Sequence, residues 1–182
     1  MQEEILLRVR KGGGDMLHII RSVRELPYSQ WMEIYYESNQ RNGREDYPEC
    51  SQEWQILNAE QDHYQYLREV FFATDGAFCA GWNMDGRYVA ALRIEPYRDG
   101  YLLAALETAP AYRRRGYATA LIKATLSYLE SIGSFPVYAH VAKKNAPSLA
   151  AHRSCGFSVL SDYAVYIDGS VLRDSYTLRY LK

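Results

Sequence analysis

The sequence predicts a single α+β domain, and three observations support this prediction. Three strand-like segments, over 77–84, 87–97 and 101–108, follow one another with only short glycine-containing turns between them. A helical segment and a further strand come next, as in a strand–helix–strand crossover. The chain has 182 residues, of which 48% are hydrophobic, and this is enough for one buried core.

Composition excludes several classes of protein. The 21 Lys and Arg against 22 Asp and Glu lack the basic excess that is typical of nucleic-acid binders. No stretch approaches the ~18 apolar residues that span a bilayer, and the acidic start is unlike a secretory signal. Three scattered cysteines indicate a reducing compartment, and the four histidines show no zinc spacing. We therefore expect a cytoplasmic protein with no nucleic-acid partner, no membrane association and no metal.

Two helices are expected before the three consecutive strands. A strand over 16–23 precedes the first helix, which has Pro27 in its first turn and runs to about residue 38. Residues 39–50 are polar and contain glycine and proline, so we expect a loop there. Ser51 can cap the second helix, which extends to about residue 72. Its apolar stripe is expected to include Trp54, Leu57, Tyr64, Leu67 and Phe71.

The later elements are expected to enclose the core. The segment 101–108 is apolar on both faces, which predicts a central strand. The remaining elements are a helix over 116–132, a strand over 135–141, a short helix ending at 155–156, and closing strands over 157–167 and 173–181. The inner stripe of the long helix is expected to be Ala118, Leu121, Ile122, Thr125, Leu129 and Ile132.

The most informative stretch lies between the central strand and the long helix, where the sequence reads Arg113-Arg114-Arg115-Gly116-Tyr117-Ala118. The first amides of a helix have no internal partner and lie at the positive end of its dipole. Small residues at 116 and 118 let an anion approach them, and the arginines add positive charge. The pattern is neither a Rossmann fingerprint nor a Walker loop. It predicts a pyrophosphate site, and the alternative is a solvated helix start.

The residues Arg113-x-x-Gly116-x-Ala118, followed by a helix, a strand and the segment from Asn145 to Phe157, resemble the GCN5-related N-acetyltransferase (GNAT) superfamily. The element order over 16–182 also fits one GNAT domain. The resemblance implies a mixed, mostly antiparallel sheet of six to seven strands with helices on both faces. It also implies a splay between the fourth and fifth core strands. Residues 1–15 lie outside the match, as an N-terminal extension without an assigned role.

The resemblance implies that acetyl-CoA is the cosubstrate. Its pyrophosphate would contact the amides of 114–118, and its pantetheine arm would pair with the strand end at 106–108, where the Thr108 amide would polarise the acetyl carbonyl. The start of the last helix would contact the arm. The implied cofactor-binding residues are Leu106, Glu107, Thr108, Arg113, Arg114, Arg115, Gly116, Tyr117, Ala118, Asn145 and Ser148.

Transfer to an amine requires a base, because a free alkylamine has a pKa of ~10.4 and is charged at pH 7. His140 is the first candidate and Glu107 the second. The alternatives are a packed strand histidine and a carboxylate paired with an arginine. His152 lies seven residues after Asn145, where many GNAT members have a tyrosine that protonates the leaving thiolate. A histidine can take that role near neutral pH, or the role is lost here.

The function that the resemblance implies is direct transfer of an acetyl group from acetyl-CoA to a primary amine of a small molecule or protein. The alternative is a non-catalytic GNAT-fold module that binds acyl-CoA as a sensor or interaction domain. Near-neutral charge does not select one amine over another. Dimers are common in this superfamily, so a homodimer stays open.

Overall fold

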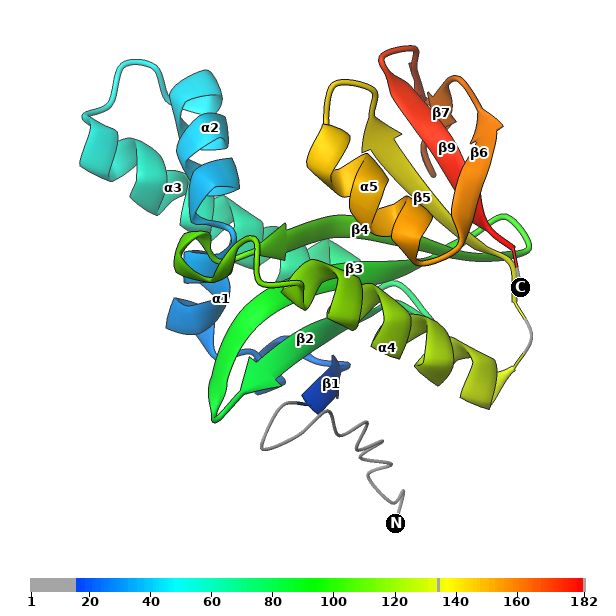
Figure 1. Cartoon of the computed structure of the whole chain (residues 1–182). Coiled ribbons are helices and arrows are strands. Elements are labelled where there is room, and N and C mark those ends of the chain that lie inside the picture. Colours follow the sequence, from blue (N-terminus) through cyan, green and yellow to red (C-terminus); the bar gives the residue numbers. More distant parts are fainter. Residues whose placement is uncertain (1–15, 134, 182) are drawn as a thin grey trace.

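A computed structural model describes residues 16–133 and 135–181, and Figure 1 shows their arrangement. The helices are α1 (Tyr28–Ile34), α2 (Tyr36–Asp46), α3 (Gln52–Tyr66), α4 (Tyr117–Ile132) and α5 (Ala146–Ser154). The strands are β1 (Met16–Ile20), β2 (Phe78–Met84), β3 (Arg87–Tyr97), β4 (Gly100–Thr108), β5 (Val137–Ala142), β6 (Phe157–Ser161), β7 (Ala164–Val165), β8 (Val171–Leu172) and β9 (Ser175–Tyr180). The predicted N-terminal extension over 1–15 lies outside the described residues.

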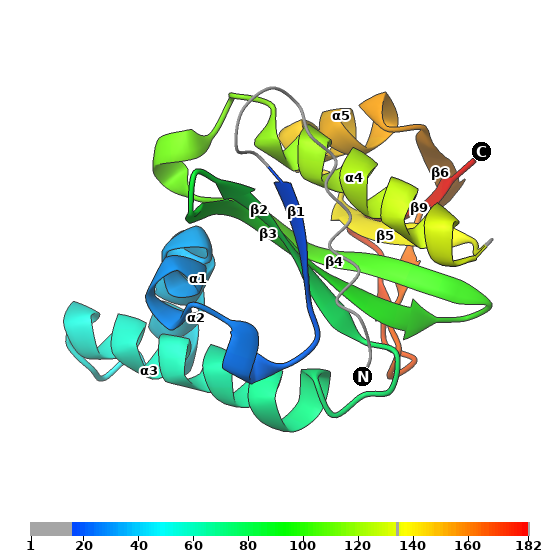
Figure 2. The same ribbon diagram turned by 90° about the horizontal axis from the view of Figure 1, so that it is seen from below.

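One seven-stranded sheet forms the centre of the molecule, in the order β1-β2-β3-β4-β5-β9-β6. Neighbouring strands are antiparallel except β4 and β5, which run parallel. Figure 2 shows α4 and α5 over one face of the sheet and α1, α2 and α3 over the other. The predicted α+β class and the central position of β4 are therefore confirmed.

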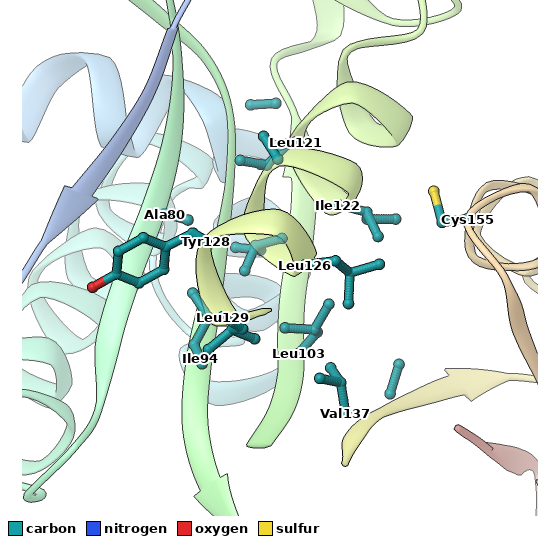
Figure 3. Close-up of a cluster of buried hydrophobic side chains, with 14 of the residues drawn as sticks. Ala80, Ile94, Leu103, Leu121, Ile122, Leu126, Tyr128, Leu129, Val137 and Cys155 are labelled. Atoms are coloured by element: carbon teal, nitrogen blue, oxygen red, sulfur yellow. The ribbon is translucent and has the colours of Figure 1, made fainter. Parts of the chain in front are cut away.

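The main core lies between α4 and the sheet. Figure 3 shows Leu129 of α4 beside Ile94 of β3, and Leu121 and Ile122 belong to the same buried cluster as Ile94 and Leu103. Burying a leucine or isoleucine side chain contributes roughly 1.5–3 kcal/mol, so this stripe holds α4 against the sheet. The predicted stripe is wrong at its end, because Ile132 is 46% exposed in the last turn of the helix.

The α2 helix is the largest difference from the prediction. Residues 39–46 were expected to be loop, but they continue α2 to Asp46. The helix lacks an apolar stripe because it packs on α3 through small and polar residues. A Cβ atom on Gly43 would lie 2.3 Å from the carbonyl oxygen of Gln55 in α3. The buried Asn39, one turn earlier, hydrogen bonds through Oδ1 with Nδ1 of His63 in α3.

The α3 helix has the predicted extent but differs in two details. Its C-terminal end continues into a π-helical turn, Leu67–Phe71, whose first and last residues are buried as expected. Trp54 and Leu57 are exposed rather than buried, since the first turns of α3 extend beyond the sheet. Ser51 stands at the N-cap position, but its side chain makes no capping hydrogen bond.

The closing region also differs from the prediction. The single strand expected over 157–167 is interrupted, so that β6 pairs with β9 while β7 pairs with β8 in a separate two-stranded sheet. The register between β6 and β9 shifts between Val159 and Ser161. Tyr97 of β3 donates a hydrogen bond through its hydroxyl to the carbonyl oxygen of Val165 at 2.6 Å, which ties β7 to the larger sheet.

Candidate active site

The parallel strands β4 and β5 separate partway along their length. Their pairing starts at Tyr101 with Val137 and ends at Leu103 with Ala139, although β4 continues to Thr108. Beyond Leu103, the edge of β4 that faces β5 has no strand partner. The expected splay between the fourth and fifth core strands is therefore confirmed, and it leaves backbone groups of β4 open to an extended ligand.

A β-bulge lies on β4 within the splayed part. Ala91 of β3 pairs with Glu107 and Arg93 pairs with Ala104, so β4 has one residue more than β3 over this interval. Ala105 has a φ of +49°, in the left-handed region that non-glycine residues rarely adopt. The buried Tyr35, between α1 and α2, donates a hydrogen bond through its hydroxyl to the carbonyl oxygen of Ala105 at 2.8 Å. This contact holds the bulge in place.

The start of α4 leaves backbone amides available. Gly116 is the N-cap residue, with a φ of +85° and no capping hydrogen bond from a side chain. The amides of Gly116, Tyr117 and Ala118 donate no hydrogen bond to another described residue. A Cβ on Gly116 would have no atom within 4 Å. These are the properties that a helix start needs to bind an anion.

The three arginines differ in their surroundings. Arg113 donates through Nε to the carbonyl oxygen of Thr108 at 3.1 Å and through Nη1 to the carboxylate of Glu37 at 2.7 Å, so it joins β4 to α2. Arg115 lies over the ring of Tyr112, with 5.7 Å from Cζ to the ring centroid. Arg114 and Arg115 are exposed beside the helix start. Positive charge near the predicted pyrophosphate therefore comes mainly from these two residues.

The α5 helix places the second predicted group of residues. Asn145 caps it, because its Oδ1 accepts a hydrogen bond from the amide of Ser148 at 3.2 Å. His152 is buried, its Nδ1 donates to the carbonyl oxygen of Ser148 at 2.9 Å, and its ring contacts Phe157. Burial lowers the pKa of His152, which favours the neutral imidazole near pH 7. A role in protonating the thiolate stays a prediction.

His140 follows Ala139 on β5, immediately past the last residue that pairs with β4. Its ring lies between those of Tyr97 and Tyr166, with centroid distances of 5.3 and 5.0 Å. Neither ring nitrogen has a hydrogen-bond partner among the described residues. Burial, with a smaller effect of the positive charge on Arg98, lowers the pKa of His140 to about 4. His140 is therefore neutral at pH 7 and is a weak base.

A cavity of about 500 Å³ lies between the α2–α3 pair and the bulged part of β4. Glu107 and Ala105 belong to its lining, and His140 does not. We call it the Glu107 cavity. The other polar residues that line it are Tyr35, Ser38, Asn39, Arg41, Asn42, Asp46, Asp62, His63, Tyr66 and Arg93.

Glu107 is one of three carboxylates that line the Glu107 cavity, together with Asp46 and Asp62. Ser38 donates a hydrogen bond through Oγ to Oε1 of Glu107. Burial raises the pKa of Glu107, although the hydrogen bond from Ser38 and the charges of Arg41 and Arg113 act in the opposite direction. Ser38 and Arg41 were not among the predicted site residues, since Ser38 was expected to end a helix and Arg41 to lie in a loop. The signal that could have found them is the spacing of 35, 38 and 41 on one helical face.

Within residues 16–133 and 135–181, no group of three or more His, Cys, Asp or Glu side chains is placed to hold a metal ion. Over the same ranges, no helix combines the length and the apolar character needed to cross a membrane.

The comparison with family models decides which family this is. The model described as the acetyltransferase (GNAT) family matches residues 27–157, which is more than half of the chain. The chain belongs to the acetyltransferase (GNAT) family. The resemblance seen at 113–118 and 145–157 is thus confirmed, and with it the acyltransferase class of the protein. A comparison with curated proteins finds no significant match.

Solved structures of this family share the fold at low sequence identity. The PaiA N-acetyltransferase from Thermoplasma acidophilum, in complex with coenzyme A, has a TM-score of 0.61 at 12% identity, over 91% of this chain and 99% of that one. An IAA acetyltransferase from Bacillus cereus has a TM-score of 0.60 at 13% identity, over 92% and 99%. A spermidine N-acetyltransferase chimera from Vibrio cholerae and hSSAT has a TM-score of 0.56 at 16% identity, over 91% and 95%.

Proposed function

We propose that this GNAT acetyltransferase transfers the acetyl group of acetyl-CoA to the primary amine of a small molecule or a protein. One observation supports this most strongly. The end of β4, from Ala105 to Thr108, borders the unpaired edge that faces β5 and also the Glu107 cavity. A thioester bound along the edge and an amine bound in the cavity would meet at this strand end.

Acetyl-CoA is a substrate here, and the residues around the edge suit its chemistry. The free amides from Gly116 to Ala118 suit the pyrophosphate, with Arg114 and Arg115 supplying positive charge. The unpaired edge of β4 suits the two amides of the pantetheine arm, which can pair as an added strand does. Asn145 and Ser148 at the start of α5 are the proposed contacts from the opposite side.

The reaction balances without a covalent intermediate on the protein. The neutral amine nitrogen attacks the thioester carbonyl carbon, and the carbon–sulfur bond breaks with its electron pair going to sulfur. Glu107 accepts the proton that the amine loses, and the backbone amide near Thr108 stabilises the developing oxyanion. The thiolate leaves as such and takes a proton from solvent. Donation from His152 would require the imidazolium form, because its Nδ1 proton is engaged with the carbonyl oxygen of Ser148 and burial lowers its pKa. Glu107 is preferred to His140 as base, because Glu107 lines the Glu107 cavity.

A non-catalytic acyl-CoA sensor is the second candidate. The observation that favours it is His152, which replaces the tyrosine of many relatives and is buried with a lowered pKa. A sensor of this kind would bind acetyl-CoA without releasing its thiol.

The test combines binding and turnover on the full chain. Release of the CoA thiol is measured with a panel of amines for the wild type, for Glu107→Gln and for Glu53→Gln, a control at an exposed carboxylate of α3. Loss of the base should lower kcat/KM by roughly 10²–10⁴, while the control should match the wild type. Thermal stabilisation by acetyl-CoA should be the same in all three. Thermal stabilisation by acetyl-CoA without release of the CoA thiol, whichever amine is added, would favour the sensor. If acetyl-CoA neither stabilises the protein nor releases its thiol, both candidate functions are contradicted.

A further inference from the structure

Tyr35, which precedes α2, and the first turn of α2 contact the end of β4 at Ala105 and at Glu107. Tyr35 donates through its hydroxyl to the carbonyl oxygen of Ala105 at 2.8 Å. One helical turn later, Ser38 donates through Oγ to the carboxylate of Glu107. Residues three apart lie on the same side of a helix, so one face of α2 contacts both the bulge and the carboxylate. Figure 1 shows α2 beside the end of β4.

A third contact reaches the last residue of β4 from the same turn. Glu37 pairs with Nη1 of Arg113 at 2.7 Å, and Nε of Arg113 donates to the carbonyl oxygen of Thr108 at 3.1 Å. The segment 35–38 therefore contacts Ala105 and Glu107 directly and Thr108 through Arg113. These are the residues of β4 at which the proposed reaction takes place.

Arg41 extends the contact between Ser38 and Glu107. Its Nη2 donates a hydrogen bond to Oγ of Ser38 at 3.2 Å. A serine hydroxyl has one proton, and here that proton goes to Glu107, so a lone pair on the oxygen accepts from Arg41. The guanidinium, the hydroxyl and the carboxylate thus form a chain in which both hydrogen bonds are polarised in the same direction, toward the carboxylate.

We infer that Ser38 and Arg41 are positioning residues for Glu107, which hold it as a carboxylate with Oε1 occupied by the Ser38 hydroxyl and leave Oε2 to take the proton of the acceptor amine. The inference rests on the proposed function for its catalytic meaning. Neither residue needs to touch the substrate. Their effect comes through the orientation and the charge of Glu107.

Several charged groups surround Glu107, and their effects oppose one another. Burial is the largest influence and raises its pKa, and Glu37 acts the same way. The hydrogen bond from Ser38 and the charges of Arg41 and Arg113 lower it. Asp46 of α2, Arg93 of β3, and Asp62 and His63 of α3 line the same cavity. A carboxylate that burial makes harder to ionise depends on its remaining donors, and Ser38 is the donor in direct contact.

The first experiment measures Glu107 without any substrate. The side-chain carboxyl carbon of Glu107, identified by its loss in Glu107→Gln, is titrated by NMR in the wild type and in Ser38→Ala. We expect the pKa in the variant to rise by on the order of one unit, because a hydrogen bond to the charged form is lost. An unchanged midpoint would overturn the inference, whether or not the protein turns over any amine.

The second experiment measures the catalytic consequence as a pH profile of kcat/KM. Ser38→Ala and Arg41→Gln should move the acidic limb to higher pH, and Ser38→Thr, which keeps the hydroxyl, should restore it. Ser154→Ala, at an exposed serine of α5, is the matched control and should leave the profile unchanged. Thermal denaturation of each variant separates a loss of folded protein from a loss of positioning, and Ser38→Thr provides a second, conservative variant.

The two experiments separate failure of the inference from failure of the function. A shifted titration with an unshifted profile would overturn catalytic positioning by Ser38. Absence of turnover in the wild type would contradict the proposed function, and the NMR titration would still decide whether Ser38 controls Glu107.

Discussion

The two sides of the β4 end are built from different kinds of groups. On the side that faces β5 and α4, the available groups are backbone amides, exposed by the splay after Leu103 and by the start of α4 at Gly116. On the side of the Glu107 cavity, the groups are side chains from α2, α3 and β3. Backbone groups follow from the fold, whereas side chains can change without altering it. The comparison therefore suggests that the fold determines the acyl donor and that the α2–α3 layer determines the acceptor.

The first prediction, with the largest change, concerns the affinity for CoA at the start of α4. Gly116→Asp places a carboxylate and a Cβ in open space beside amides that are proposed to bind the pyrophosphate. Juxtaposed like charges cost several kcal/mol, so CoA affinity should fall by roughly 100-fold or more. Calorimetric titration with CoA measures it, and an unchanged affinity would refute the phosphate site.

The chain offers a matched control for this substitution. Gly169 has a φ of +84°, and a Cβ there would also have no atom within 4 Å. Gly169→Asp, in the turn between β7 and β8, introduces the same backbone strain and charge away from the site. It should bind CoA as the wild type does.

The second prediction concerns the pH dependence of the free energy of unfolding, which a histidine in the Glu107 cavity is expected to control. His63 lines the Glu107 cavity, and burial, with a smaller effect of Arg93, lowers its pKa to about 4. Between that value and ~6.5 the unfolded chain binds more protons than the folded chain, so stability falls as the pH falls through this window. The contribution of His63 to the free energy of unfolding should decrease by about 3 kcal/mol.

Denaturant unfolding at a series of pH values measures this effect in the wild type and in His63→Gln. The variant should lose a large part of the dependence between pH 6.5 and 4. A wild-type slope that persists unchanged in the variant would show that His63 does not control it.

The last prediction concerns the stability contribution of the bulge at Ala105, which lies between the splayed edge of β4 and the Glu107 cavity. Tyr35→Phe removes the hydrogen bond to the carbonyl oxygen of Ala105. Ala105 is exposed, so water can reach its carbonyl oxygen once the tyrosine hydroxyl is removed. The free energy of unfolding should therefore fall by about 0.5–1.5 kcal/mol, the net contribution of a typical hydrogen bond. Tyr163→Phe, at a tyrosine that is 44% exposed, is the control and should be nearly neutral. Equal stability of both variants would show that the bulge does not depend on Tyr35.

The same contrast explains how much of the fold the sequence could predict. The strands from β2 to β4 and the helix α4 have apolar residues at the spacing of strands and helices, and they were predicted within a few residues. The α2 helix has polar residues at 39–46 and packs on α3 through Gly43, so hydrophobic periodicity could not reveal it. The interruption between β6 and β7 follows Ser161 and Asp162, and it was missed because apolar residues are frequent on both sides of these two.

The candidate site also has one part that the sequence could predict and another that it could not. The start of α4 with its available amides could be predicted from Gly116 and Ala118, because its local geometry follows from residue types that are adjacent in the chain. Ser38 and Glu107 are far apart in the sequence, and only the packing of α2 on β4 brings them together. The proposed preference for Glu107 over His140 as base also rests on the structure, because Glu107 belongs to the cavity lining and His140 does not.

The central claim is that CoA binds to backbone groups on one side of β4 while the acceptor cavity stays separate. The most direct measurement is an amide NMR titration of the full chain with CoA, followed by addition of an amine that the enzyme acetylates. CoA should shift the amides of Gly116, Tyr117 and Ala118 together with those of 106–108, and the amine should then shift Ser38 and His63. CoA-induced shifts centred on α2 and α3, with the start of α4 unaffected, would contradict the account.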